Sequence, residues 1–192
     1  MDGFGKYKRL GQTRDDAAGE AFDKVAKLLG LGYPGGPIID ELSRAGNQKA
    51  VRFPRPVLSK NSLDFSFSGL KTAVVNYVKA HPEPPEGYPG DLIKDIVSSF
   101  QEAVVEVLVK KTVQAAQHEG LKRIVLSGGV AANQRLRQKI KEESFEQKLK
   151  IYLPSPSFCT DNAAMIGVVG SYYLKKGVRS PYSLNAFSSL PL

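Results

Sequence analysis

Short segments of this chain place carboxylate and amide side chains beside glycine-rich turns, an arrangement that suits the binding of a polar or anionic ligand. In the first segment, Asp23 lies on a helix-forming stretch, and the loop GLGYPGGP brings Gly36 to the start of a second helix that carries Asp40. Glycines let bare backbone amides approach a ligand, and a helix start offers unpaired N–H groups and a positive dipole end. The sequence therefore predicts a binding corner between Asp23 and Asp40.

These residues also have a purely structural interpretation. Asp23 lies four residues before Lys27, a spacing at which an ion pair stabilises a helix by about 0.2–0.5 kcal/mol. A Pro-Gly-Gly-Pro loop can be only a turn, because glycine supplies positive φ and proline fixes its own φ without any ligand. Spacing alone leaves both interpretations open.

A second segment, RIVLSGGVAANQRL over residues 123–136, reads as an apolar strand that breaks at Gly128 and Gly129 and restarts as a helix near Ala131. Asn133 is expected in the first turn of that helix. Ligands of open α/β sheets bind where such turns lie, at the carboxyl ends of strands. The alternative is a strand–helix connection whose glycines serve close packing. The segment matches neither the dinucleotide fingerprint nor a P-loop.

A third segment, SFCTDNAAMIG over residues 157–167, places Asp161 directly before a helix of small residues. As a helix cap, Asp161 would accept a backbone hydrogen bond whose loss costs about 0.5–2 kcal/mol. As a hard oxygen donor at the mouth of a cleft, it could hold a metal ion or a phosphate-bound cation. Read alone, the segment favours the cap.

The hydrophobic pattern predicts the elements that position these segments. Apolar residues at helical spacing indicate a helix before Gly30 and a long helix that ends at Gly120, two glycines that suit helix stops. The expected elements, in order, are a strand at 6–12, helices at 18–29 and from 37, a strand at 63–67, a helix from 68–69, a proline-rich connector at 81–90, a helix at 91–119, a strand at 124–126, a helix to 143, a strand at 149–153 and a final helix. Alternating strands and helices favour a layered α/β domain.

In this order, the segments GEAFDK, GLGYPGGP, LSGGVAANQRLR and CTDNAAMIG resemble the tRNA threonylcarbamoyladenosine transferases, formerly called O-sialoglycoprotein endopeptidases or glycoproteases. The resemblance runs from about Tyr7 to Tyr173 and covers only the later part of a family member. It implies a two-lobed α/β fold of the actin, sugar-kinase and heat-shock-ATPase class, with nucleotide bound between the lobes. Residues 1–192 would form one domain, mostly the second lobe.

The resemblance also implies roles for single residues. Asp23 would bind the ribose or adenylate part of ATP or a threonylcarbamoyl-adenylate, Gly36 would offer its backbone, and Asp40 would add a second polar contact. Asn133 would touch the nucleotide. Asp161 would be the one ligand from this chain to an iron or zinc ion. No residue is assigned a catalytic role.

Two features of the family are missing from this chain. The family's other metal ligands are two histidines spaced HxxxH, whereas this chain has only His81 and His118, whose spacing is not a chelating one. The glycine-rich SGGHT segment of the first lobe is also absent. Because a catalytic zinc generally has three protein ligands and an open position, Asp161 alone is a poor metal site.

Composition indicates a globular protein of 192 residues with 42% hydrophobic content and one cysteine, Cys159, which excludes an internal disulfide. The N-terminus lacks an apolar signal region, and no apolar run approaches the ~20 residues that cross a bilayer. These features predict a cytoplasmic protein with no membrane partner.

A net charge of +8 and a pI near 9.5 suit a nucleic-acid partner, because Lys and Arg neutralise phosphates. The densest basic run is expected on a solvated helix surface, at Arg135, Arg137, Lys139 and Lys141. A looser basic loop could follow an RNA backbone, with Arg44, Lys49, Arg52, Arg55 and Lys60. The resemblance identifies that RNA as tRNA.

The predicted function is transfer of threonylcarbamoyl from its adenylate to the adenosine beside a tRNA anticodon, carried out by a complete protein of which this chain is the C-terminal part. The chain alone is expected to turn over little or nothing. The alternative is a non-catalytic nucleotide-binding module that docks the missing N-terminal lobe or partner subunits of a threonylcarbamoyl-transfer complex. A kinase-like phosphotransferase is a weaker rival. A peptidase has no support, since the chain lacks HExxH and any triad spacing.

Overall fold

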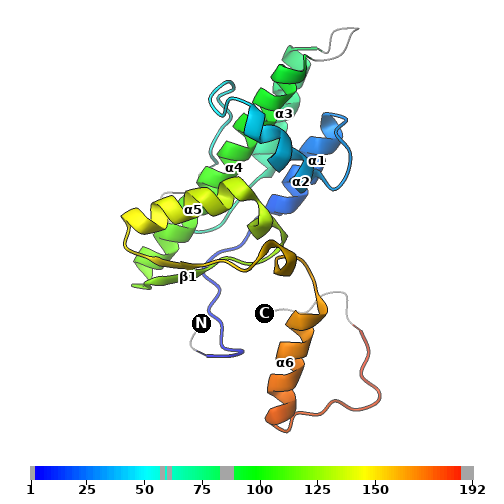
Figure 1. Cartoon of the computed structure of the whole chain (residues 1–192), viewed down its shortest axis with the longest axis vertical. Coiled ribbons are helices and arrows are strands. Elements are labelled where there is room, and N and C mark those ends of the chain that lie inside the picture. The colour runs from blue at the N-terminus through cyan, green and yellow to red at the C-terminus, as the bar shows by residue number, and fades with distance from the viewer. Residues whose placement is uncertain (1–2, 57–58, 60–61, 83–88, 187–192) are drawn as a thin grey trace.

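The computed structural model describes residues 3–56, 59, 62–82 and 89–186 of the chain. Most of the proline-rich connector, at 83–88, and Lys60 of the basic loop lie outside the described residues. Figure 1 shows helices packed around one long central helix, a small sheet beside it and a last helix that projects from this body. The elements are α1 (Ala18–Leu28), α2 (Gly35–Leu42), the 3-10 turn η1 (Ser43–Ala45), α3 (Ser68–Ala80), α4 (Gly90–His118), β1 (Arg123–Val125), η2 (Gly129–Ala132), α5 (Gln134–Glu146), β2 (Lys150–Tyr152), η3 (Pro156–Phe158) and α6 (Ala163–Lys175).

The long helix α4 belongs to two hydrophobic clusters at once. Its first half packs against α1, α2 and α3, where the rings of Phe22 and Phe100 meet edge to face with centroids 5.3 Å apart. Its second half packs against β1 and α5 through Val105, Val109 and Ile140. A helix covered on so many sides carries apolar residues almost all round. The predicted long scaffold helix at 91–119 is thereby confirmed.

Glycine ends the two predicted helices as expected. Gly30 has φ +68° after α1, and Gly120 has φ +64° after α4, a left-handed conformation that side chains rarely adopt. The next residue then turns back, since the N–H of Leu121 donates to the carbonyl of Ala116 at 2.8 Å. Local sequence therefore sets where these helices stop.

The sheet contains two short parallel strands, with Ile124 of β1 in register with Ile151 of β2. Ile124 is buried, and both isoleucines pack toward α4 and α5. The other face of the sheet is open, since Val125 is 71% exposed and Tyr152 42% exposed. A parallel sheet with helices confirms the α/β class, although only one face of the sheet is covered by the described residues.

The strands predicted at 6–12 and 63–67 are wrong. Between these segments the described residues form one isolated bridge, in which the N–H of Phe65 donates to the carbonyl of Gln12 at 2.9 Å. Alternation marks residues that could line a sheet, but a strand also needs a partner along its length. Here side chains take the backbone groups instead: Asp64 accepts from the N–H of Gln12, and Asp15 from those of Phe67 and Ser68.

No helix in the described part of the chain combines the length and apolar character needed to cross a bilayer.

Candidate functional site

The corner between α1 and α2 forms as the sequence predicts, and Asp23 holds it together. The Asp23 carboxylate accepts the backbone N–H of Gly35, the first residue of α2, at 2.7 Å. Among the described residues no ion pair joins Asp23 to Lys27, so the surface-pair interpretation of Asp23 is wrong. The second carboxylate oxygen of this half-buried residue has no hydrogen-bond partner within the described part of the chain and can accept one from a ligand.

The two glycines at the start of α2 serve different purposes. A Cβ on Gly35 would lie 2.6 Å from the Cβ of Ala26 and 2.7 Å from the carbonyl oxygen of Phe22, so Gly35 is needed for close helix packing. A Cβ on Gly36 would meet nothing within 4 Å. The backbone of Gly36, the residue predicted to face the ligand, therefore borders open space. A shallow pocket of about 580 Å³ lies on this corner, lined by Glu20, Asp23, Lys24, Lys27, Gly30, Gly32 and Tyr33.

Replacing Gly35 with alanine is expected to lower the free energy of unfolding by about 1–3 kcal/mol, because the added methyl overlaps backbone that cannot move aside. Gly36→Ala is the matched control, and it should leave stability unchanged or raise it by about 0.4–1 kcal/mol. Urea unfolding followed by circular dichroism measures both. Equal stabilities for the two variants would contradict this assignment of Gly35.

Asp40 connects the corner to the second predicted segment. It is buried on α2, and both of its carboxylate oxygens lie 3.2 Å from the N–H of Gln134, the first residue of α5. The Arg44 guanidinium lies 3.6 Å from the same carboxylate. A carboxylate suits the positive end of a helix dipole. Asp40 therefore fixes α5 beside α2.

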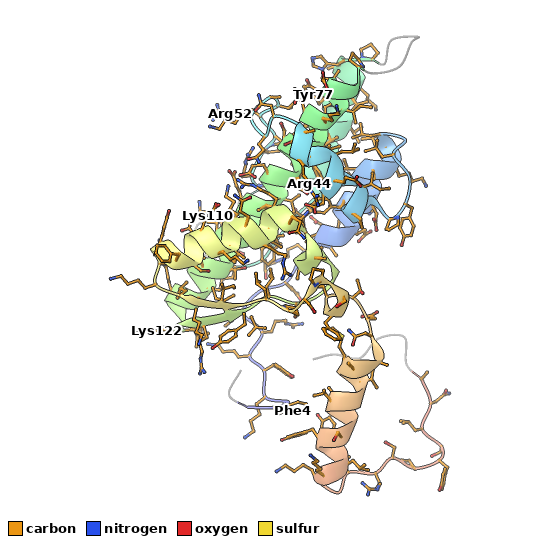
Figure 2. The ribbon with its side chains drawn as sticks, in the orientation of Figure 1. Phe4, Arg44, Arg52, Tyr77, Lys110 and Lys122 are labelled. Atoms are coloured by element: carbon orange, nitrogen blue, oxygen red, sulfur yellow. The ribbon has the colours of Figure 1, made fainter. Side chains whose placement is uncertain are left out.

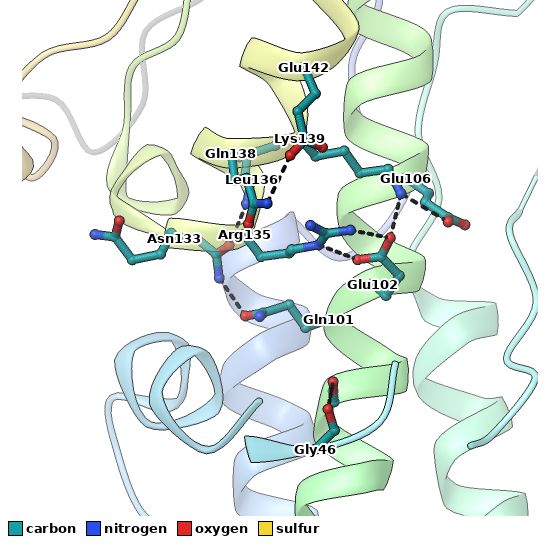
Figure 3. Close-up of polar contacts among 12 residues, drawn as sticks. Gly46, Gln101, Glu102, Glu106, Asn133, Arg135, Leu136, Gln138, Lys139 and Glu142 are labelled. Carbon is teal, nitrogen blue, oxygen red and sulfur yellow. Dashed lines mark hydrogen bonds and ion pairs between the residues drawn. The ribbon is translucent and has the colours of Figure 1, made fainter. Parts of the chain in front are cut away.

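Asn133 precedes α5 instead of lying in its first turn, and this corrects the predicted helix start near Ala131. After the turn at Gly128, which has φ +89°, the chain forms η2, and Asn133 then caps α5. Its Oδ1 accepts the N–H of Leu136 at 2.9 Å, and its Nδ2 donates to Oε1 of Gln101 at 2.6 Å (Figure 3). The capping geometry explains the shift, because an N-cap residue has extended backbone angles.

Four of the five predicted site residues thus lie on elements that touch one another. Asp23 and Gly36 stand on either side of the α1–α2 corner, and Asp40 and Asn133 meet at the start of α5. The glycine turn joins them, since Val130 approaches Gly19 of α1. The carboxylates of Asp23 and Asp40 therefore link α1 to the start of α2, and α2 to the start of α5.

Asp161 lies apart from this group, in the exposed loop before α6. The cap of α6 is Asn162, whose side chain accepts the N–H of Met165 at 3.2 Å, so the capping interpretation of Asp161 is wrong. The described residues contain no group of three His, Cys, Asp or Glu side chains that could hold a metal ion. His81 and His118 make local contacts, with Tyr77 and Glu119. The described part of the chain therefore does not fit an iron or zinc ion by itself.

The basic run on α5 is largely engaged in contacts, which corrects the expectation of a solvated surface. Arg135 and Lys139 both bind the carboxylate of Glu102 on α4, with Arg135 Nε 2.6 Å from Oε2 (Figure 3). Lys139 also pairs with Glu106 at 3.0 Å, and Glu106 with Arg55 of the basic loop at 2.6 Å. Burial raises the pKa of Glu102, but the hydrogen bonds from the two cations outweigh it and lower this pKa to about 2.

Sequence reasoning missed Gln101 and Glu102, which it treated as part of a scaffold helix. Their signal was a polar pair between apolar residues, in the stretch Phe-Gln-Glu-Ala-Val-Val of the long helix. Gln101 is 4% exposed and Glu102 6% exposed. Buried polar residues on a scaffold helix indicate a partner on another element.

Apolar side chains are exposed on α6, on η3 and on the open face of the sheet. No residue of α6 is buried, although most of the helix is apolar, and Ile166 is 75% exposed. From the N-terminal segment, Phe4 stacks on Tyr172 with ring centroids 3.9 Å apart (Figure 2). The exposed apolar residues are Val125, Tyr152, Phe158, Met165, Ile166, Val168, Val169, Tyr173 and Leu174. We call these residues the α6 surface.

Solved structures share the fold. A crystal structure of HypF from T. kodakarensis matches 83% of this chain and 20% of that chain, with a TM-score of 0.59 and 21% identity. A full-length HypF in its phosphate- and nucleotide-bound form matches with a TM-score of 0.58 and 20% identity, over 83% of this chain and 21% of that chain.

Sequence comparison is more specific. A relative from Syntrophotalea carbinolica, named tRNA N6-adenosine threonylcarbamoyltransferase, is 55% identical over 100% of this chain and 55% of its own length. One of the same name from Geobacter metallireducens is 51% identical over the same shares. The chain thus spans about half the length of the curated relatives it matches, and it matches their later half. The family model for tRNA N6-adenosine threonylcarbamoyltransferase matches residues 1–168, and the chain belongs to that family.

Proposed function

We propose that this chain is the nucleotide-binding second lobe of a tRNA N6-adenosine threonylcarbamoyltransferase, in the fold class of actin, sugar kinases and heat-shock ATPases. The complete protein would be an acyltransferase that moves threonylcarbamoyl from threonylcarbamoyl-adenylate to the adenosine beside the anticodon of tRNA. One observation carries the proposal: Asp23, Gly36, Asp40 and Asn133 lie on α1, on α2 and at the cap of α5, three helices that the carboxylates of Asp23 and Asp40 join.

In this proposal the corner holds the adenylate and does not react with it. The free oxygen of Asp23 accepts a ribose hydroxyl, and the open backbone at Gly36 lets the nucleotide approach the start of α2. Asp40 keeps α5 in place, so that Asn133 contacts the nucleotide from the other side. The adenosine amine attacks the carbamoyl carbon of the mixed anhydride, a C–N bond forms, the bond to the adenylate oxygen breaks, and the amine loses a proton. Holding both reactants in this geometry lowers the barrier.

Asp161 would supply one ligand to an iron or zinc ion, and the first lobe would supply the others. The Asp161 carboxylate is exposed and pairs with no described residue, so it can coordinate a metal ion. A cytoplasmic location, tRNA and partner subunits of a threonylcarbamoyl-transfer complex complete the proposal. Lys49 and Arg52 of the basic loop are exposed, whereas Arg44 and Arg55 already pair with Asp40 and Glu106.

The first lobe is the partner that best fits the α6 surface. This surface is apolar and adjoins the loop that carries Asp161. The relatives have a first half that this chain does not span. We therefore propose that the first half packs on the α6 surface and thereby closes the nucleotide site.

Calorimetric titration with ATP tests the proposal, on the chain alone and beside the separately expressed first part of the Syntrophotalea carbinolica relative. Asp23→Ala should weaken ATP binding by roughly tenfold, the loss expected when one hydrogen bond between a carboxylate and a ligand is removed. Asp91→Ala is the control, because this carboxylate is 94% exposed in the first turn of α4. Unchanged binding by Asp23→Ala would exclude the corner as the nucleotide site.

The second candidate function is a non-catalytic nucleotide-binding and docking module. The lack of a metal-binding cluster among the described residues favours it for the chain as it stands. A mixture of the two halves that binds ATP but transfers no threonylcarbamoyl to tRNA would support this candidate over the transferase.

A further inference from the structure

We propose that Gln101 is a positioning residue, which fixes the side-chain amide of Asn133 so that it presents one defined N–H to the nucleotide. The inference rests on the proposed nucleotide site. Gln101 lies on α4, the helix that packs against α2 and α5, and is 4% exposed. Its Oε1 accepts the hydrogen bond from Nδ2 of Asn133 at 2.6 Å (Figure 3).

The hydrogen bonds leave one orientation for the Asn133 amide. The N–H of Leu136 is a backbone group that can only donate, so the atom that faces it, 2.9 Å away, is the oxygen Oδ1 of Asn133. The nitrogen Nδ2 must then face Gln101, which therefore turns its own oxygen toward Asn133. One hydrogen of Nδ2 is used in this contact. The other hydrogen has no acceptor among the described residues, and although Asn133 is only 8% exposed, in the proposed site this hydrogen donates to an acceptor on the ligand, such as a ribose or phosphate oxygen or a ring nitrogen.

The cap contact between Asn133 and Leu136 would not by itself fix the direction of the second Nδ2 hydrogen. The amide torsion of asparagine is broad, so a single contact at Oδ1 allows the amide plane to rock. Gln101 adds a second anchor on the opposite side of the amide. The adjacent residue of α4, Glu102, holds Arg135 and Lys139 of α5. Neighbouring residues of α4 thus fix both the Asn133 side chain and the helix that it caps.

The test compares ATP affinity across three variants of the 192-residue chain by calorimetric titration. Gln101→Leu removes the acceptor at similar size and should weaken ATP binding by roughly tenfold, because an unanchored donor loses part of its hydrogen bond. Gln101→Glu keeps an accepting oxygen at this position and should restore affinity to within about threefold of the original. The matched control is Gln117→Leu, also on α4. It removes an exposed hydrogen bond of 2.7 Å between the side-chain amides of Gln117 and Gln147.

A second measurement separates this inference from the proposed function. In NMR spectra of the free chain, the side-chain NH2 resonances of Asn133 should be distinct and slow to exchange, should collapse toward the solvent-exposed position in Gln101→Leu, and should recover in Gln101→Glu. Affinity that is equally weak in Gln101→Glu and Gln101→Leu, or unchanged in both, would overturn the positioning role. If the original chain binds no ATP, the nucleotide site fails, and unaltered Asn133 resonances in Gln101→Leu would overturn the anchor as well.

Discussion

Aspartate at Ile166, Val169 and Tyr173 of α6 is expected to abolish association between this chain and the first part of the Syntrophotalea carbinolica relative. The three residues recur at helical spacing and are 75%, 42% and 43% exposed, so they form one apolar stripe of the α6 surface. Burying such a stripe contributes about 25 cal/mol per Å² of apolar area, and charges on it would remain unpaired in an interface. We expect the dissociation constant to rise by more than about a hundredfold.

The length of α6 also indicates that this helix needs a partner surface. An isolated helix shorter than about 12–15 residues is marginal in water, and most helical stability in proteins comes from packing of an apolar face. The α6 helix has 13 residues and no buried one. Apart from the ring contacts of Phe4, no residue of α6 belongs to a hydrophobic cluster of the described residues, and the first half of the family's length is the covering surface proposed here.

Size-exclusion chromatography and calorimetry of the mixed halves measure this association. Phe145→Asp is the matched control, because Phe145 is 86% exposed on α5 and lies outside the α6 surface. It should leave the dissociation constant unchanged. Association of the triple variant with undiminished affinity would show that the first half docks elsewhere, whereas a concentration-dependent dimer of the original chain would identify a second copy as the occupant.

Short sequence patterns predicted the features that are set by residues close together in the sequence, such as helix ends and turns. The stops at Gly30 and Gly120, the long α4 and the glycine turn before Asn133 follow from helix periodicity and from the need of a positive φ. The resemblance then identified the family, which the comparisons confirm. Its residue roles are predictions that the ATP titrations of Asp23→Ala and Gln101→Leu test.

Contacts between distant segments were the part that sequence could not supply. The predicted strand at 63–67 has the right alternation, yet its one bridge joins Phe65 to Thr13, just after the other predicted strand, and the backbone N–H of Gln12 donates to the side chain of Asp64. Likewise, Arg135 and Lys139 read as solvated cations until Glu102, more than thirty positions earlier, is placed beside them. Charge spacing within one helix does not reveal a carboxylate on another.

Glu102→Ala is expected to lower the free energy of unfolding by about 3 kcal/mol at neutral pH. Removing one partner of a buried ion pair leaves the other charge uncompensated. Here Arg135 would lose its carboxylate partner and Lys139 would keep only the half-exposed Glu106, while the side chains of Arg135 and Lys139 are only 19% and 23% exposed. Glu106→Ala is the control one turn further along α4, where a carboxylate that is 35% exposed should cost about 1 kcal/mol or less.

The same carboxylate should make stability depend on acid pH. The pKa of Glu102 falls from 4.5 to about 2 on folding, so its contribution is fully present above pH 4.5 and is lost as the pH drops toward 2. Denaturant unfolding at several pH values should therefore show a steeper loss of stability in this range for the original chain than for Glu102→Gln, which keeps the size but cannot ionise. Parallel slopes for the two proteins would mean that Arg135 and Lys139 gain little from this contact, and α5 would then be held mainly by Asp40, Asn133 and the apolar residues beneath it.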